Sequence, residues 1–135
     1  MVNASAEDGS PRPASGVVLI DKPSGVTSFM MVRQVRRLLG IKKVGHAGTL
    51  DPFATGLLIV CIGRPATRLI DRFMAGEKRY RAVLQLGVET ETLDPEGQVV
   101  GTSEVPDLNE EEIKRCLAGF VGRQMQAPPA YSAVK

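Results

Sequence analysis

The sequence is poor in the residues that build several common kinds of site. It contains no tryptophan, one histidine and two cysteines among its 135 residues. His46, Cys61 and Cys116 lie far apart in the chain, so they offer no cluster of ligands for a structural zinc ion. We therefore expect a protein without a metal site, in which both cysteines are reduced core residues, as in cytosolic proteins.

Long apolar runs and a secretory leader are also missing. The longest uninterrupted apolar run is Leu57 to Ile62, much shorter than the roughly 20 residues that a membrane-spanning helix requires. The N-terminus lacks the basic and then apolar pattern of a signal peptide. These absences predict a cytoplasmic protein without membrane contact, and its length fits one domain or a part of a larger one.

Charge is unevenly distributed, although the formal net charge is only +2. The stretch from Lys22 to Val88 contains twelve basic and three acidic residues, a net charge of +9, whereas Glu89 to Glu112 contains nine acids and no base. A basic stretch that spans several elements favours a polyanionic partner, for which nucleic acid is the usual example. The alternative is a solvated charged surface without a partner.

Local patterns predict a mixed sheet with helices packed on it. Apolar runs and alternation indicate strands at residues 16–21, 57–62, 78–88 and 98–104, with a short one at 124–126. Helical patterns cover residues 29–39, 65–75 and 110–118. Residues 1–15 are expected to form a disordered tail, residues 41–56 a loop for the most part, and residues 127–135 an extended segment.

Capping signals support two of these helices. Thr27 or Ser28 can cap the first helix, and Gly40 can end it. Asn109 with Glu112 forms a capping box at the last helix, so the acidic cluster there has a structural explanation. In the middle helix, Leu69, Ile70 and Phe73 are expected to face inward.

The segment from Gly45 to Gly56 reads Gly-His-Ala-Gly-Thr-Leu-Asp-Pro-Phe-Ala-Thr-Gly. Its glycines allow a large ligand to approach the backbone closely. Pro52 restricts Asp51 to an extended backbone and so fixes the direction of its carboxylate. A lone Asp-Pro pair is more often only a turn. The segment lacks the Gly-Lys-Ser/Thr ending of a phosphate loop, and no second acid follows as in a paired-carboxylate hydrolase.

This segment resembles the catalytic motif of the TruB family of tRNA pseudouridine synthases. Three further segments resemble motifs of that family and stand in the family's order: Leu19–Ser28, Glu77–Ala82 and Pro128–Lys135. The resemblance implies the pseudouridine synthase fold, an α+β domain around a mostly antiparallel sheet. Residues 16–135 would be its N-terminal catalytic portion, and the family would continue beyond Lys135, so the chain alone is expected to be inactive.

The resemblance further implies isomerisation of uridine 55 in the T-loop of tRNA to pseudouridine, without cofactor or metal, by a protein that is monomeric at full length. It makes Asp51 the catalytic carboxylate. Because the target base must leave its stack, Tyr80 would stack on the flipped uracil and His46 would displace or hold the nucleotide. A core position is the alternative for Tyr80, and a loop or core position for His46.

Lys22 is expected to bind substrate by shaping the floor of the cleft, with a solvated turn residue as the alternative. Four basic residues are expected to contact RNA phosphates: Arg36, Arg37, Lys42 and Lys43. Two further hypotheses concern the whole chain. One is a non-catalytic RNA-binding or RNA-chaperone module that uses the same basic surface. The other is a structural half-domain that only pairs with the rest of its chain.

Overall fold

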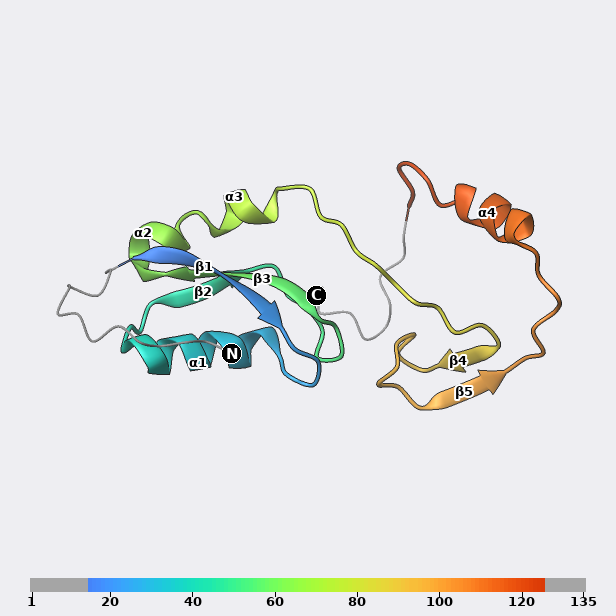
Figure 1. The fold of residues 1–135 in the computed structure, drawn as a ribbon, viewed down its shortest axis with the longest axis horizontal. Helices are drawn as coiled ribbons and strands as arrows, with labels where there is room; N and C mark the ends of the chain where they lie inside the picture. Colours follow the sequence, from blue (N-terminus) through green and yellow to red (C-terminus); the bar gives the residue numbers. More distant parts are fainter. Residues whose placement is uncertain (1–14, 126–135) are drawn as a thin grey trace. The chain divides into compact units, whose positions relative to one another are not determined.

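The computed structural model describes residues 15–125 of the chain. The expected N-terminal tail, apart from Ser15, and the motif at Pro128–Lys135 lie outside the described residues. The described residues form two compact units, one that ends at Arg79 and one that begins at Tyr80, and their elements are labelled in Figure 1. Within the described part, no helix is long and apolar enough to cross a membrane.

The first unit is built on a three-stranded antiparallel sheet with the order β1-β3-β2. Its strands are β1 (Gly16–Lys22), β2 (Val44–Ala47) and β3 (Gly56–Ile62). β3 lies in the centre, as its apolar run predicts. The pairing of β1 with β3 ends at Lys22 and Gly56. This register brings the turn that follows β1 next to the loop that precedes β3.

Helix α1 (Ser28–Leu39) begins and ends where the sequence predicts. The Thr27 hydroxyl caps it by accepting from the Met30 amide at 3.1 Å, and Gly40 ends it in the left-handed conformation, with a φ of 66°. Figure 1 shows α1 on one side of the sheet. Its buried Val32 packs with the residues of β2 and β3 that form the core: Val44, Leu58, Val60 and Ile62.

The single helix expected at residues 65–75 is wrong, because the chain forms two short helices, α2 (Gly63–Thr67) and α3 (Ile70–Met74). Between them the Leu69 amide donates to the Ala66 carbonyl at 3.0 Å. The Thr67 hydroxyl donates to the Arg64 carbonyl at 3.2 Å. Both bonds reach a carbonyl three residues back, which tightens the turn and interrupts the α-helical ladder.

Helices α2 and α3 lie on the side of the sheet opposite to α1 (Figure 1). Ile70 faces inward as predicted: a Cβ atom at Gly45 of β2 would lie only 2.9 Å from its Cδ1 atom. Leu69 and Phe73 are exposed instead. Cys61 of β3 is fully buried, and this burial raises the pKa of its thiol. Cys61 is therefore the core cysteine that its apolar setting predicts.

The strand β2 corrects the expectation of a loop over residues 41–56. Val44–Ala47 contains a glycine and a histidine and has little intrinsic strand preference. Its backbone nevertheless pairs with β3 from Val44↔Ile62 to Ala47↔Ile59. Pairing with an apolar central strand therefore overrides the local pattern, and residues 41–43 and 48–55 remain a loop.

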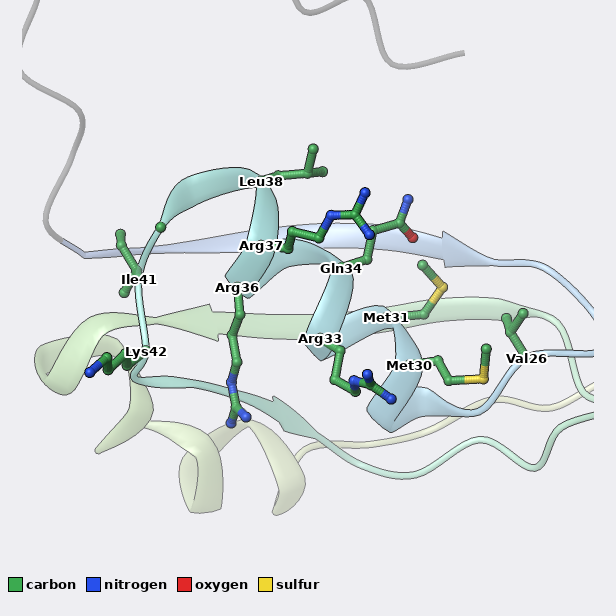
Figure 2. Close-up of a pocket in the computed structure, with 11 residues that line it drawn as sticks. Val26, Met30, Met31, Arg33, Gln34, Arg36, Arg37, Leu38, Ile41 and Lys42 are labelled. Carbon is green, nitrogen blue, oxygen red and sulfur yellow. The ribbon is translucent and has the colours of Figure 1, made fainter.

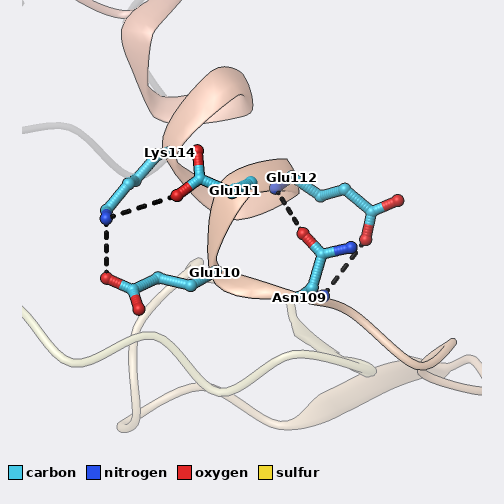
Figure 3. A network of polar contacts seen from close by, with 5 residues as sticks. All are labelled: Asn109, Glu110, Glu111, Glu112 and Lys114. Atoms are coloured by element: carbon cyan, nitrogen blue, oxygen red, sulfur yellow. Dashed lines mark hydrogen bonds and ion pairs between the residues drawn. The ribbon is translucent and has the colours of Figure 1, made fainter.

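The second unit contains the hairpin of β4 (Val88–Thr90) and β5 (Val99–Thr102) and the helix α4 (Glu110–Ala118). Figure 3 shows the predicted capping box: the Glu112 amide donates to the Asn109 side chain at 2.9 Å, and the Asn109 amide donates to the Glu112 carboxylate at 3.1 Å. Cys116 on α4 is exposed, so its expected core position is wrong. The neighbouring apolar side chains of α4, Ile113 and Leu117, are also exposed, so the described residues do not bury this face of the helix.

The long strand expected at residues 78–88 is also wrong, because residues 77–85 have no regular structure and pairing begins at Val88. Tyr80 is 70% exposed and Leu84 is 75% exposed. A strand needs a neighbour for its backbone N–H and C=O groups, and no described strand pairs with residues 78–87. Gln124 and Met125 likewise lack the short strand expected there.

Candidate active site

The loop between β2 and β3 carries Asp51 on a tight bend. Gly48 and Gly56, at its two ends, have φ values of 98° and 116°. No described atom lies within 4 Å of a Cβ atom built on either glycine, so the backbone conformation and not the space requires glycine there. Inside the bend, the Ala54 amide donates to the Asp51 carbonyl at 3.1 Å. This hydrogen bond closes a turn from Asp51 to Ala54, and the Asp51 side chain is exposed on it.

A buried lysine fastens this loop to the turn after β1. Lys22 is fully buried, and its ammonium group donates to the carbonyls of Pro23 at 2.9 Å, Val26 at 2.7 Å and Pro52 at 3.2 Å. The Gly25 amide donates a second hydrogen bond to the Pro52 carbonyl at 2.8 Å. An ammonium group tolerates burial only when its three hydrogens are paired, and here carbonyls pair all three.

Lys22 is therefore not the solvated turn residue that was the alternative. Its three donors point at main-chain carbonyls of the turn and of the Asp51 loop. With these donors occupied, Lys22 acts on the shape of the loop. A direct bond from Lys22 to substrate would require one of these three bonds to break.

Two serines complete the connection between the turn and the loop. The Ser24 hydroxyl donates to the Phe53 carbonyl at 3.0 Å. The Ser28 hydroxyl donates to the Leu50 carbonyl at 3.0 Å and accepts from the Leu50 amide at 2.9 Å. The backbone is thus anchored on both sides of Asp51. The sequence contains a signal for the Ser28 contact, because Thr27 and Ser28 at the helix start offer two hydroxyls and a cap needs only one.

The residues that the structure describes do not engage the Asp51 carboxylate. Among the hydrogen bonds and ion pairs of residues 15–125, none involves its side-chain oxygens. Within the described residues, no cation or backbone donor therefore holds this carboxylate. The arrangement presents a solvated carboxylate, on a firmly held backbone, to a ligand that approaches from outside.

His46 has a defined orientation on β2. Its Nδ1 atom lies 2.8 Å from the Gly48 carbonyl oxygen. A carbonyl only accepts, so Nδ1 carries the hydrogen, and in the neutral ring Nε2 keeps its lone pair. The half-buried imidazole thus ties the end of β2 to the first residue of the Asp51 loop. His46 thus lies on a strand and not in a loop. Its role toward the nucleotide stays a prediction.

Tyr80 belongs to the second unit and lies outside any helix or strand. Its side chain is 70% exposed, so the alternative of a core residue is wrong for this structure. An exposed ring has a free face on which a base can stack. The stacking of Tyr80 on uracil stays a prediction.

The basic residues on and after α1 differ in their surroundings. Arg36 is half-buried: its Nη2 atom donates to the Val44 carbonyl at 2.7 Å, and its guanidinium carbon lies 5.9 Å from the centre of the Phe29 ring. Figure 2 shows Arg33 and Arg36 extending to one side of the helix, and Gln34 and Arg37 to the other. Arg36 thus bridges α1 and β2, which leaves less of its guanidinium for a phosphate.

Arg37 and Lys42 are exposed and line a hollow of about 1010 Å³ along α1 (Figure 2). Lys43 lies in a second hollow of about 450 Å³, together with Arg64, Arg68 and the hydroxyl-bearing Thr67. No pattern in the sequence singles out Arg64 or Arg68. The antiparallel pairing of β2 with β3 places Lys43 beside the helix that follows β3, and the Gly63 amide donates to the Lys43 carbonyl at 2.7 Å.

Comparison with known proteins decides the family. Residues 36–135 match the model for the N-terminal domain of the TruB family of pseudouridylate synthases. The chain belongs to the TruB family. The match includes the whole Asp51 loop and β3, so the TruB motif and the anchored loop are the same segment.

Among relatives, the chain is 66% identical over 121 residues to tRNA pseudouridine synthase B of Desulfotalea psychrophila, with 90% of the chain and 49% of the relative covered. It is 50% identical over 125 residues to tRNA pseudouridine synthase B of Chlamydia muridarum, with 92% and 51% covered. This TruB family chain therefore spans about half the length of the curated relatives that it matches.

A solved structure shares the fold. The crystal structure of a Cbf5-Nop10-Gar1 complex aligns with 89% of this chain and 31% of the other chain, at a TM-score of 0.59 and 29% sequence identity. The chain thus has a partial pseudouridine synthase fold, with antiparallel sheets and packed helices. This confirms the predicted fold class of the TruB family member.

Proposed function

We propose that the protein to which this chain belongs isomerises a uridine of tRNA to pseudouridine, with uridine 55 of the T-loop as its target. Membership of the TruB family and the names of the two relatives support this proposal. The structural observation that carries it is the Asp51 loop. Its backbone is anchored at Leu50, Pro52 and Phe53, while the Asp51 side chain stays exposed to a ligand.

The chemistry of this isomerisation suits a single carboxylate. The bond from N1 of uracil to C1′ of the ribose breaks, and a bond from C5 of the ring to the same C1′ forms. A hydrogen leaves C5, and one is gained at N1, so the atoms of substrate and product balance without oxidation or reduction. In the proposal Asp51 serves this exchange as nucleophile or as base.

The remaining residues act on the RNA. The uridine is flipped out of the T-loop so that its reacting atoms reach the carboxylate. Tyr80 stacks on the flipped uracil, and His46 holds the displaced nucleotide, with its ring oriented by the Gly48 carbonyl. Lys22 shapes the cleft floor through the Pro52 carbonyl.

Basic side chains bind the phosphates of the tRNA. Arg37 and Lys42 do so along α1, and Lys43 does so in its hollow with Arg64 and Arg68. Arg36 contributes the part of its guanidinium that the Val44 carbonyl leaves free. We propose that the full-length protein works as a cytoplasmic monomer, without cofactor or metal.

Tritium release tests the activity. A T-loop tRNA with tritium on C5 of its uridines loses that label to water when pseudouridine forms. The full-length protein is compared with Asp51→Asn and with Asp71→Asn, which alters an exposed carboxylate of α3 outside the Asp51 loop. We expect no release by Asp51→Asn with tRNA binding kept, and normal release by Asp71→Asn.

Each outcome separates the hypotheses. Normal release by Asp51→Asn would rule out its catalytic role. No release by the unaltered protein, with tRNA still bound, would favour an RNA-binding or RNA-chaperone module, and absence of tRNA binding at low salt would favour a structural half-domain. Pseudouridine mapped outside position 55 would disprove the proposed target.

We also propose that the 135-residue chain is inactive alone. Within the described residues, the Asp51 carboxylate has no cationic partner, and the chain spans about half of its relatives. Tritium release by the isolated chain would contradict this statement.

A further inference from the structure

Ser28 is a buried serine whose hydroxyl is not needed for the usual task at its position. It is the first residue of α1 and only 2% exposed. A serine or threonine at a helix start commonly caps the helix. Here the Thr27 hydroxyl does so, by accepting from the Met30 amide at 3.1 Å. The Ser28 hydroxyl is therefore available for a contact outside its own helix.

That contact is a pair of hydrogen bonds to one residue, Leu50. The hydroxyl donates to the Leu50 carbonyl at 3.0 Å and accepts from the Leu50 amide at 2.9 Å. One hydroxyl thus fixes the two peptide groups that flank Leu50. The second of these groups contains the nitrogen of Asp51. Because Ser28 is only 2% exposed, water competes little with its hydroxyl for these bonds.

The backbone on the other side of Asp51 is fixed as well. The Pro52 carbonyl accepts from the Lys22 ammonium at 3.2 Å and from the Gly25 amide at 2.8 Å. Pro52 also keeps the Asp51 backbone extended. The Asp51 carbonyl, in the peptide group directly after Asp51, accepts from the Ala54 amide at 3.1 Å. With the backbone held before and after it, Asp51 keeps little freedom beyond the rotation of its own side chain.

We infer that Ser28 is a positioning residue, which sets the place of the Asp51 carboxylate through Leu50. This inference rests on the proposed function, since it concerns the carboxylate that reacts there. Ser28 is itself too deeply buried to touch RNA. Its loss should therefore slow the chemical step and leave the binding of tRNA unchanged.

The experiment uses the full-length protein and the adjacent hydroxyl as a matched control. Ser28→Ala removes the bonds to Leu50, whereas Thr27→Ala removes a cap on the same helix end without touching the loop. Because a displacement of about 1 Å can cost roughly a hundredfold in rate, we expect Ser28→Ala to lower the single-turnover rate by roughly ten- to a hundredfold. The dissociation constant for tRNA should stay as in the unaltered protein, and Thr27→Ala should keep both values.

Two conservative variants complete the rate series. Ser28→Thr keeps the hydroxyl and should recover most of the rate. Ser28→Cys keeps the size but offers only weak hydrogen bonds, and it shows the same selective loss of rate if Ser28→Ala does not fold. Equal single-turnover rates in Ser28→Ala and Thr27→Ala, whether both are normal or both are lowered, would overturn the inference. So would a loss of tRNA affinity in Ser28→Ala that parallels its loss of rate.

Hydrogen exchange gives a readout that does not depend on activity. The Leu50 amide should exchange faster in Ser28→Ala, and at its normal rate in Thr27→Ala. Unchanged exchange in Ser28→Ala would overturn the inference even if the rate fell. If the unaltered protein forms no pseudouridine, the proposed function fails, and the exchange rate still decides whether Ser28 holds the loop.

Discussion

Replacing Lys22 with methionine should destabilise the first unit, although methionine has a similar length and carries no charge to bury. The Lys22 ammonium group is the shared partner of three carbonyls, those of Pro23, Val26 and Pro52. Methionine supplies no donor. The carbonyls of Pro23 and Val26 then lose this partner, whereas the Pro52 carbonyl keeps the Gly25 amide at 2.8 Å.

The magnitude follows from these two lost bonds. A hydrogen bond to a charged group contributes about 1.5–3 kcal/mol, so the loss of two amounts to about 3–6 kcal/mol. The variant no longer has to dehydrate an ammonium group, and this recovered cost offsets part of the loss. We expect the free energy of unfolding to fall by about 2–4 kcal/mol.

Urea unfolding followed by circular dichroism measures the difference. Lys78→Met is the control, because the Lys78 ammonium also donates to main-chain carbonyls, those of Met74 and Gly76, but at the surface. Little change is expected for this control, since water replaces the lost donor. If Lys22→Met were as stable as the unaltered protein, or if both variants lost equal stability, burial would not be the reason for the strength of the Lys22 contacts.

Three further predictions concern other parts of the chain. Hydrogen bonds from the Thr92 hydroxyl and the Glu96 amide hold the pKa of Asp94 below its ordinary value of 3.8. Ionised Asp94 therefore stabilises the hairpin fully above that ordinary value, and this stabilisation is lost as the pH falls through the lowered pKa. Amide exchange in the turn should accordingly become faster in acid, and Asp94→Asn should abolish this acid dependence. An acid dependence that persists in Asp94→Asn would contradict the assignment to Asp94. Asn109→Ala should cost α4 about 1 kcal/mol, seen as faster exchange of the Glu112 amide, and unchanged exchange would show that the capping box contributes little. Arg68→Ala should reduce the slope of log tRNA affinity against log salt concentration by about 0.7–0.9, measured by filter binding, and an unchanged slope would remove Arg68 from the interface.

The elements that the sequence predicts correctly are those whose signals are local. Helix α1 has its cap at Thr27 and its end at Gly40, and both act within one turn of the chain. The apolar run of β3 needs burial on both faces and therefore a central place. The capping box of α4 is likewise contained in four residues.

Elements that depend on pairing with a distant segment are not predictable in this way. The strand β2 forms because β3 supplies its hydrogen bonds, although its own residues favour a loop. The alternating residues 78–87 show the converse, since their pattern suits a strand but no described strand pairs with them.

In the candidate site, too, the local features are predictable from the sequence and the contacts between distant segments are not. The bend at Asp51 can be predicted from the sequence, because Pro52 and the glycines act locally. The contacts of Lys22 and Ser28 are not, because they depend on the register in which Lys22 pairs with Gly56. The gathering of Lys43 with Arg64 and Arg68 depends in the same way on the pairing of β2 with β3.

The chemical nature of the loop anchors has an evolutionary consequence. On the loop side, every anchoring atom belongs to the main chain of Leu50, Pro52 or Phe53. On the turn side, the side chains of Lys22, Ser24 and Ser28 make these bonds, and the Gly25 amide adds one to the Pro52 carbonyl. Main-chain atoms persist whatever side chain is attached, so mutations at positions 50 and 53 can vary the outline of the loop without detaching it. Purifying selection should instead concentrate on the turn, whose amino acids have few substitutes.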